Sequence, residues 1–502
     1  MVWVVENLTL VLVVTAATLW YLTYLWRRRK LYIYSWNVPG PVSLPFIGIG
    51  YLFLGKTEDY LDKLIKVVEQ YPCPAKIWLG PRLIYLLSDP YHVEKILTNQ
   101  KCLGKDYLYK FVIYNIGTGL LTAPPAKWKK HRKLIMPSFN QKILDSFVDI
   151  FTEQAAIFTN VLKTYAGRKD IDISKPVAAL MMDIICETAM GLKMNTQGGD
   201  NAFAMHLEGI MEIATIRIFN VWHHLDWTWR LYPLSRELDK YLTGFHDVTS
   251  KVIKKKLEVF KREKENRKNS LVAQVEEGGY KKKLAFLDLL LENSEFTEEE
   301  LKEEVEVFLI AGTDTSGTTT CFLFEIFGLY PEIQQKVYEE VIDVLGEDRL
   351  VEASDLPKLK YLERVIKETL RLFPVAVYFL RTVGEDVDLG KYTLPEGSSV
   401  LFSSVNIHRD PKHWPDPLKF DPDRFLPEEV AKRHPCSYIP FSYGPRNCIG
   451  IRYAMMSLKT IAATTVRKYK MFTRYKSVEE IELMTKIVVR PKYGYKVYLE
   501  HR

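Results

Sequence analysis

Cysteine is scarce in this chain, and its spacing excludes several kinds of site. The 502 residues contain six cysteines, and no two of them form a C-x-x-C pair. This pattern argues against a zinc ribbon and against a thioredoxin-type redox motif. Six scattered cysteines in so long a chain also do not resemble the disulfide framework of a small secreted domain. We therefore expect a main body that is cytosolic and reduced.

The chain also lacks a strong net charge, internal repeats and low-complexity tracts. A formal charge of +7 is mild for this length and by itself gives no reason to expect a nucleic-acid partner. Hydrophobic residues make up 47% of the chain and charged residues 26%, which excludes a disordered or multi-span membrane protein. The length exceeds one ordinary domain, but large single-core enzymes reach it.

No charged residue occurs between Asn7 and Trp26. A helix of this length would be about 30 Å long, the thickness of a bilayer core. A basic run at residues 27–30 follows, and the positive-inside rule places it and the rest of the chain in the cytosol. A cleaved signal peptide is the alternative, but its positive charges would precede the apolar run. The sequence therefore predicts an uncleaved transmembrane anchor within residues 1–30.

Residues 31–50 are rich in proline. Pro39, Pro41 and Pro45 fix their own φ and lack backbone donors, so we expect a stiff, extended linker between the anchor and a body at residues 51–502. An ordinary linker and a spacer that sets the pose of the body on a membrane are compatible interpretations.

The body is predicted to be mainly α with small β-sheets. Amphipathic stretches at residues 141–161 and 297–327 predict long helices, and β-like runs occur at 75–87 and 487–499. Residues 251–283 are heavily charged and predict a solvated helix with a surface loop. A tryptophan-rich stretch, residues 218–234, fits either a core segment or an exposed apolar patch that dips into a membrane.

The helix predicted from residue 297 breaks the usual rules in its middle. A T-x-x-E capping box at residues 297–300 would start it, but the segment AGTDTSGTTT at 311–320 brings glycines and threonines into its interior. Glycine there costs about 1 kcal/mol relative to alanine, and such conflicts are expected mainly at functional sites. Gly312 would allow a close approach to the backbone, with Asp314 and Thr315 at that opening. A plain helical kink is the alternative.

A second feature is the pair Glu368 and Arg371 in the stretch KETLRL. Residues three apart share a helix face and can pair, although exposed pairs contribute little. A buried pair would need a further partner to offset its desolvation, and Arg424 in FDPDRF offers one.

The third feature is the loop FSYGPRNCIG, near the end of the chain. A thiolate is a metal ligand, and backbone N–H groups together with a nearby cation stabilise it. Gly444 and Gly450 would let a flat cofactor lie against the backbone. Phe441 would shield the Cys448 sulfur from water, and Arg446 could pair with a carboxylate of the cofactor. A lone cysteine is more often a small buried hydrophobe, but that interpretation does not explain the residues around it.

Together these stretches resemble the cytochromes P450. The loop fits the F-x-x-G-x-R-x-C-x-G signature of the family, AGTDTS fits its oxygen-activation segment, and WKKHR at 128–132 fits its W-x-x-x-R motif. Glu368, Arg371 and Arg424 match its structural triad. The resemblance covers the chain after the anchor, and within the family it is strongest to arthropod members of the microsomal family 4 clan.

The resemblance implies a haem-binding monooxygenase domain over residues 51–502. Haem b would be ligated by the thiolate of Cys448, a ligand that favours O–O cleavage. Asp314 and Thr315 would support proton delivery to dioxygen, and Ala311 and Gly312 would lie against the cofactor. Its propionates would be held by Trp128, Arg132, Arg381 and Arg446.

Two departures from family 4 stand out. Many members carry a glutamate where Ala311 stands, and that glutamate can bond covalently to the haem. Ala311 cannot form such a bond, so we expect haem that is not covalently attached. A histidine common in the same segment is replaced by Thr313. Both changes weaken the expectation of strict terminal hydroxylation of fatty acids.

The implied reaction inserts one oxygen atom of O2 into an apolar substrate that is fatty-acid-like, pheromone-like or xenobiotic. Electrons would come from NADPH through NADPH-cytochrome P450 reductase, with cytochrome b5 as a second candidate donor. The enzyme would sit in the endoplasmic reticulum membrane, in contact with lipid, with its catalytic domain in the cytosol. The alternatives are an isomerase or dehydratase of the same fold, against which an intact Asp314–Thr315 argues, and a haem-bearing protein that binds apolar ligands.

The resemblance also places a substrate pocket and a partner surface. The pocket would be lined by the stretch after Cys102, by residues 205–219, 375–379 and 484–485, and by the helix before Thr315. The basic segment AKWKKHRK at residues 126–133 would lie on the Cys448 side of the haem. Only Trp128 and Arg132 would turn inward from it, which would leave the lysines as a docking patch for an acidic reductase.

Overall fold

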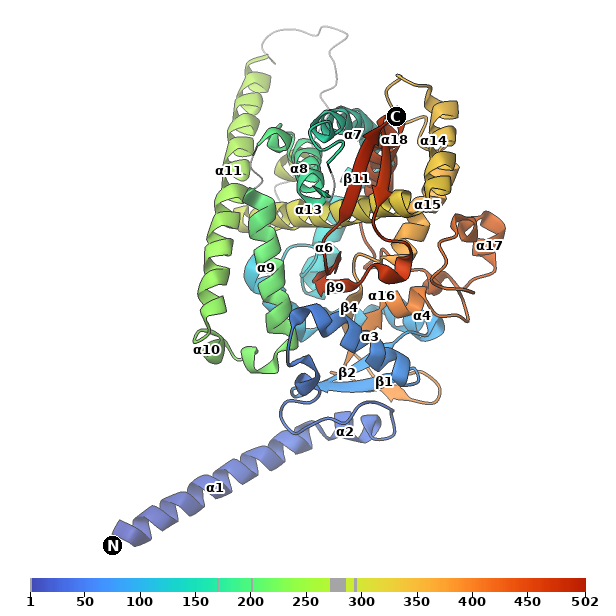
Figure 1. Ribbon diagram of the computed structural model, residues 1–502. Helices are drawn as coiled ribbons and strands as arrows, with labels where there is room; N and C mark the ends of the chain where they lie inside the picture. The colour runs from blue at the N-terminus through green and yellow to red at the C-terminus, as the bar shows by residue number, and fades with distance from the viewer. Residues whose placement is uncertain (1, 169–170, 200–201, 271–285, 293–295) are drawn as a thin grey trace.

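A mainly helical body with small sheets and one projecting helix make up the protein (Figure 1). The computed structural model describes residues 2–168, 171–199, 202–270, 286–292 and 296–502. The predicted mainly α architecture with small β-sheets is confirmed.

Helices supply most of the body. In chain order they are α1 Val2–Arg27, α2 Arg29–Ser35, α3 Tyr60–Gln70, α4 Pro90–Thr98, α5 Lys110–Ile116, α6 Pro125–Ile135, α7 Gln141–Leu162, α8 Ser174–Ile185, α9 Ala202–Phe219, α10 Asp226–Trp229, α11 Pro233–Ser270, α12 Phe286–Glu292, α13 Glu298–Leu329, α14 Pro331–Leu345, α15 Lys360–Leu372, α16 Ser404–His408, α17 Pro427–Ala431 and α18 Ile451–Lys468. The strongly charged stretch 251–283 is helical as far as Ser270, and residues 271–283 lie outside the described part of the chain.

The strands form small sheets beside the helices. They are β1 Ala75–Leu79, β2 Arg82–Leu87, β3 Ile171–Asp172, β4 Tyr378–Thr382, β5 Val387–Asp388, β6 Thr393–Leu394, β7 Ser399–Ser403, β8 Tyr469–Thr473, β9 Leu483–Lys486, β10 Val488–Pro491 and β11 Lys496–His501. The largest sheet has the order β1-β2-β7-β4, with β2 parallel to β7 and the other pairs antiparallel. The β-like runs at 75–87 and 487–499 were therefore predicted correctly.

Helix α13 crosses the middle of the body (Figure 1) and begins as predicted. The Thr297 side chain accepts from the Glu300 N–H, and the Glu300 side chain accepts from the Thr297 N–H, which completes the capping box. The helix then continues without a break to Leu329. Four of its threonines (Thr315, Thr318, Thr319 and Thr320) are accommodated because their hydroxyls donate to carbonyls one turn back, as Thr319 does to Thr315.

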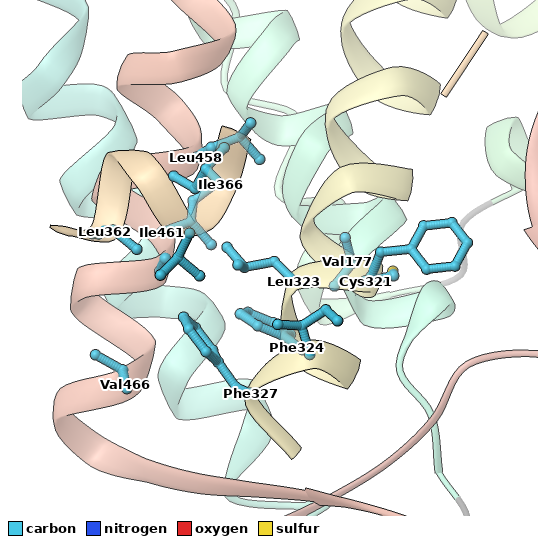
Figure 2. Close-up of a cluster of buried hydrophobic side chains, with 14 of the residues drawn as sticks. Val177, Cys321, Leu323, Phe324, Phe327, Leu362, Ile366, Leu458, Ile461 and Val466 are labelled. Atoms are coloured by element: carbon cyan, nitrogen blue, oxygen red, sulfur yellow. The ribbon is translucent and has the colours of Figure 1, made fainter. Parts of the chain in front are cut away.

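The main core fixes α13 against the helices that carry the site. Phe324 and Phe327 of α13 pack with Leu362 of α15 and with Leu458 and Ile461 of α18, all almost fully buried (Figure 2). Each such side chain contributes about 1.5–3 kcal/mol on burial. This packing sets the spacing between α13 and the start of α18, which follows the cysteine loop directly.

The N-terminal segment joins the body closely. Helix α1 projects from the body with exposed apolar side chains (Figure 1), and residues 8–27 are long and apolar enough to cross a membrane. At its end the Arg28 guanidinium bonds the Pro81 carbonyl in the β1–β2 turn and lies 5.8 Å from the Trp78 ring centroid.

The segment expected to be an extended linker is attached to the body at several points. It starts with α2, and its Pro39 carbonyl accepts from the Lys76 N–H of β1 at 2.7 Å. Val38 and Ile49 are buried. Residues 36–50 therefore run along the surface of the body, with Val38 and Ile49 buried while Trp36, Val42 and Phe46 stay exposed.

Part of the tryptophan-rich stretch 218–234 is a core segment and part is an exposed apolar patch, so each of the two interpretations of its sequence applies to some of its residues. Trp229 is buried in the core, whereas Leu225, Trp227 and Leu231 are exposed around α10. Val221 of this stretch approaches Gly50, since a Cβ there would lie 2.8 Å from it. The exposed apolar group therefore lies at the end of the molecule that carries α2 (Figure 1).

Candidate functional site

The cysteine loop is built by tight backbone turns ahead of α18. The Cys448 N–H donates to the Phe441 carbonyl at 2.9 Å and closes the loop. Ser442 and Gly444 have φ of 60° and 74°, and a Cβ on Gly444 would lie 2.2 Å from the Leu97 carbonyl oxygen. Gly444 is therefore required by its φ and by the end of α4, whereas the sequence suggested that it makes room for a cofactor.

Cys448 lies just before the N-terminus of α18. A Cβ on Gly450, the residue that caps this helix, would have only the Cys448 sulfur near it, at 3.9 Å. Free N–H groups and the positive end of the helix dipole favour an anion at this position. The loop thus presents a thiol where a thiolate is stabilised.

The Cys448 side chain is accessible, yet protein atoms surround it densely. A side chain can be accessible and still be densely surrounded when it lines an open space inside the protein. Desolvation raises the pKa of the thiol, while the Gly450 N–H and then the charge of Arg132 lower it. The pKa of Cys448 is raised on balance, and these two groups partly offset the cost of burying a thiolate.

Arg132 of α6 binds the cysteine loop directly. Its guanidinium donates to the Asn447 carbonyl at 2.6 Å and to the Asn447 side-chain oxygen at 2.8 Å. The sequence placed Arg132 at a cofactor carboxylate, and the structure places it against the residue that precedes Cys448.

Two side chains in the middle of α13 are exposed although the helix runs through the core. Ala311 and Thr315 lie one turn apart, and the Thr315 hydroxyl donates to the Ala311 carbonyl at 2.7 Å. Neighbouring residues such as Ser316 and Gly317 are buried. Ala311 and Thr315 therefore face open space inside the body.

Gly312 and Asp314 turn away from that space. A Cβ on Gly312 would lie 2.5 Å from Ile185, so this glycine lets α13 approach α8 closely. The Asp314 carboxylate forms an ion pair with Arg490 of β10, which also bonds the Thr318 hydroxyl. The sequence predicted neither partner and placed both residues at the opening.

A cluster of buried cations lies beside the cysteine loop. Arg446 donates to the carbonyls of Leu103 and Ala123, both at 2.6 Å, and lies 5.3 Å from the Trp128 ring centroid. Arg381 of β4 donates to the Arg446 carbonyl at 3.4 Å. The structure thus brings together three residues predicted to hold carboxylates.

Lys105 completes this cluster and was missed by the sequence analysis. Its ammonium lies 3.4 Å from the Tyr109 hydroxyl. Burial, followed by the charges of Arg381 and Arg446, holds its pKa well below the usual value. Burial and then Arg381 also lower the pKa of Arg446 to about 9. Lys105 belongs to no sequence motif, so only the structure shows that it lies beside Arg381 and Arg446.

Glu368 and Arg371 pair as their helix spacing predicts, and Arg424, which the sequence offered as a further partner, lies beside them. Arg371 and Glu368 are fully buried and joined by hydrogen bonds of 2.7 and 2.8 Å, and Arg424 lies 3.6 Å from Glu368. Arg371 also donates to the carbonyls of His408 and Pro417. The triad therefore ties α15 to the chain that leads toward the cysteine loop.

Comparison with known proteins decides the family. Residues 38–499 match the sequence model of the family described as "Cytochrome P450". The chain is 39% identical over 461 residues to "Cytochrome P450 4c21" of Blattella germanica, a match that covers 89% of each chain. It is 33% identical to "Cytochrome P450 4c3" of Drosophila melanogaster over 95% of this chain and 91% of the relative. It is 34% identical to "Cytochrome P450 4V2" of Rattus norvegicus over 94% and 92%.

The chain is a cytochrome P450. Membership makes it a haem-dependent monooxygenase whose iron is ligated by a cysteine thiolate, as the sequence predicted. Among the cysteines, Cys448 alone stands in the signature loop and is exposed.

The residues of this P450 fit haem b. Among the described residues, no carboxylate forms an ion pair with Lys105, Arg381 or Arg446, and the Arg446 Nε has no partner. Buried charges need compensation, and the two propionates of a haem would supply it. A thiol facing open space beside these cations completes a donor set for iron protoporphyrin.

This P450 has an apolar cavity of about 120 Å³ lined in part by Tyr109, whose hydroxyl lies 3.4 Å from the Lys105 ammonium. It is lined by residues from four of the five stretches predicted for the pocket, namely Leu108, Tyr109, Val112, Thr215, Ile218, Phe219, Tyr378 and Thr485, together with residues of β1, β2 and α3. The helix before Thr315 does not line it. Apolar walls with few polar groups are typical of sites for apolar ligands.

Proposed function

We propose that this P450 inserts one oxygen atom of O2 into an apolar substrate, with electrons passed from NADPH by a membrane-bound reductase. The observation that carries the substrate class is the cavity, which lies between strands and helices and presents almost wholly apolar walls. Fatty-acid-like, pheromone-like and xenobiotic molecules share this character.

In this proposal each residue of the site has a stated task. The Cys448 thiolate ligates the iron, and bound haem supplies the oxygen chemistry. Arg381, Arg446 and Lys105 offset the charge of the propionates, with Trp128 stacked on Arg446. Thr315 offers its hydroxyl to oxygen for proton delivery. Arg132 fixes Asn447 and keeps the ligand loop in place.

Asp314 would support proton transfer from behind α13 rather than from the open side, because its carboxylate faces Arg490. Ala311 has no carboxylate, so haem would be held without a covalent bond. Gly312 would serve the packing of α13 on α8 and act on the cofactor only through that packing.

The proposed location is the endoplasmic reticulum membrane, with the body in the cytosol. Helix α1 is long and apolar enough to span a membrane, and the basic run at residues 27–30 supports a body on the cytosolic side. The exposed side chains of Leu225, Trp227 and Leu231 would add a second contact with lipid.

Helix α6 is proposed as the docking surface for the reductase. Lys129, Lys130 and Lys133 are exposed on it. The expectation that only Trp128 and Arg132 turn inward was wrong. Lys127 is paired with Glu303 of α13 at 2.7 Å, and His131 is buried against Glu304. The outward patch is therefore smaller than the sequence suggested.

A spectral screen tests the substrate class. Apolar candidates of graded length are added to the full-length haem enzyme, and haem absorbance reports binding. Candidates that bind are then tested for product with NADPH and reductase. Binding by polar compounds alone would contradict the proposal, and turnover without NADPH or reductase would favour an isomerase or dehydratase.

A further inference from the structure

Glu325 of α13 is a carboxylic acid in the middle of the apolar core. It is fully buried between Phe324 and Ile326 in the chain, and Phe324 lies among the side chains of Figure 2. One carboxyl oxygen accepts from the Lys496 N–H at 3.1 Å. The other oxygen has no partner among the described residues. Leaving such a group unsatisfied costs about 1–3 kcal/mol, so its presence calls for a reason.

Tyr495 provides a second group of the same kind. Its ring packs edge-on against Phe322 at 5.1 Å, and its buried hydroxyl also has no partner among the residues described. Tyr495 immediately precedes Lys496, which bonds Glu325. One unsatisfied polar group therefore lies on α13 itself, at Glu325. The other lies on the segment packed behind α13, at Tyr495, next to the residue that bonds Glu325.

The segment from Arg490 to Lys496 follows the back of α13 in order. Arg490 pairs with Asp314 and bonds Thr318, Tyr495 packs on Phe322, and Lys496 bonds Glu325. Residues at spacings of 4, 7 and 11 share one helix face, and these are the positions of Thr318, Cys321 and Glu325 counted from Asp314. The helix rise puts Asp314 and Glu325 about 16 Å apart.

The Glu325 end of this face approaches solvent through β3. Asp172 is exposed there and is paired in register with Lys496. A Cβ on Gly494 would lie 3.4 Å from the Asp172 carboxylate.

The groups around Glu325 decide its protonation. Burial raises the pKa of Glu325 to about 8; the Lys496 N–H lowers it and Asp172 raises it. The titratable and charged groups that face this region are Cys321 and Asp314 on α13, Asp172 on β3, Tyr475 after β8, Arg490 on β10, and Tyr495 and Lys496 at β11. At neutral pH the carboxyl therefore carries a proton that it can give up.

We propose that Glu325 and Tyr495 form a proton route along the back of α13 that ends at Asp314. The route serves the proton delivery assigned above to Asp314 and Thr315, and it rests on that assignment. Tyr495 and Glu325 act through Asp314, so they are proton-relay positions and do not touch the reacting atoms.

The transfer is balanced without any change of oxidation state. The described residues Glu325 and Tyr495 are not hydrogen-bonded to each other, so Glu325 gives its carboxyl proton through water to the Tyr495 hydroxyl. Tyr495 passes its own proton through further water to the Asp314 carboxylate. Glu325 then takes a proton from solvent beside Asp172. Arg490 stays charged throughout and holds one Asp314 oxygen, which leaves the other oxygen to receive the proton.

Glu325→Gln and Tyr495→Phe test the route. Gln keeps an acceptor for the Lys496 N–H but holds no transferable proton, and Phe keeps the ring on Phe322. Tyr469→Phe is the matched control, because Tyr469 is a buried tyrosine of the same core whose hydroxyl donates to the Thr159 carbonyl at 2.8 Å. All are prepared as full-length holoenzyme.

The first readout needs no turnover. Infrared difference spectra of the oxidised holoenzyme over a pH series should show a protonated carboxyl band that is lost as pH rises through about 8. Glu325→Gln should abolish the band, Tyr495→Phe should shift it, and Tyr469→Phe should leave it unchanged. A spectrum without this band at neutral pH in the parent overturns the proposal.

The second readout is peroxide released per NADPH oxidised, with reductase and without added substrate. Glu325→Gln and Tyr495→Phe should each raise the peroxide fraction and lower the yield of water, because a positioned proton donor is lost. In the parent this fraction should rise with pH through about 8, because Glu325 loses its proton there, and in Glu325→Gln it should stay flat. Equal fractions in parent and variants overturn the route. A parent that consumes no NADPH contradicts the proposed function instead, and the infrared series still decides on the route.

Discussion

Arg132 holds Asn447 at two points, the backbone carbonyl and the side-chain oxygen, and Asn447 immediately precedes Cys448. Lys127 and His131 of the same helix bind Glu303 and Glu304 of α13. Helix α6 therefore joins the ligand loop to the helix that carries Thr315, and the two sides of the haem site are set by one element.

The first prediction concerns the charge of Arg132. Arg132→Gln removes a cation that lowers the pKa of Cys448, so the thiol should be protonated at a higher pH than in the parent. Acid titration of the reduced carbon monoxide complex measures this as loss of the thiolate-type spectrum. Lys133→Gln, an exposed neighbour, is the control. An unchanged titration midpoint in Arg132→Gln would show that the charge has no influence on the ligand.

The ligand itself gives the second prediction. Cys448→Ala should abolish the thiolate-type spectrum of the reduced carbon monoxide complex, because no other cysteine lies in the signature loop. Cys436→Ala, a buried cysteine upstream of the loop, should keep the spectrum. A thiolate spectrum retained by Cys448→Ala would contradict the assignment of Cys448 as the iron ligand.

Thr315 should matter for coupling and little for stability. Its hydroxyl makes one intrahelical bond to the Ala311 carbonyl and is otherwise exposed to the open side of α13. Thr315→Ala should retain haem and stability to within about 1 kcal/mol, but divert reducing equivalents to peroxide and water. Product formed per NADPH is the measurement, with Thr319→Ala as the control. Unchanged coupling would count against the role in proton delivery.

Breaking the triad should destabilise the fold. Arg371→Ala would leave the buried Glu368 carboxylate without its partner, at a cost of about 3–5 kcal/mol. Arg364→Ala, which removes a partly exposed arginine on the same helix, should cost far less. Denaturant midpoints of the haem enzyme compare the two. Similar midpoints would mean that the triad is not a structural centre.

Charge reversal on α6 tests the partner surface. Lys129→Glu with Lys130→Glu should slow reductase-supported turnover at low salt and spare substrate binding, and raising the ionic strength should slow the parent likewise. Reversal of Lys163 and Lys175, exposed lysines outside α6, is the control. If the α6 variant accepts electrons as fast as the parent, the patch is only a solvated helix face.

Local chemistry decided what could be predicted from the sequence. The capping box and the helix at 141–161 follow from residues close together in the chain, and the structure has them as expected. The pairing of Glu368 with Arg371 also follows from helix spacing.

Long-range partners could not be predicted. Asp314 is held by Arg490, 176 residues away, and a short-range pattern contains no sign of that contact. The sequence indicated correctly that Gly312 and Gly444 allow a close approach to the backbone. The group that approaches is not a cofactor, however, but Ile185 at Gly312 and Leu97 at Gly444. Lys105 belongs to no motif, and only the fold brings it to Arg381 and Arg446.

The attached segment after α1 dictates where the chain can be cut. A shortened chain for aqueous expression that starts near residue 29 would lose the exposed apolar helix and the contacts of Arg28 with Pro81 and Trp78. One that starts at residue 51 would also lose Val38 and Ile49 from the interior and the Pro39 carbonyl that pairs with Lys76. The first cut should give a soluble haem protein, and the second should give one that unfolds at a lower temperature, because β1 would stand as an uncovered sheet edge.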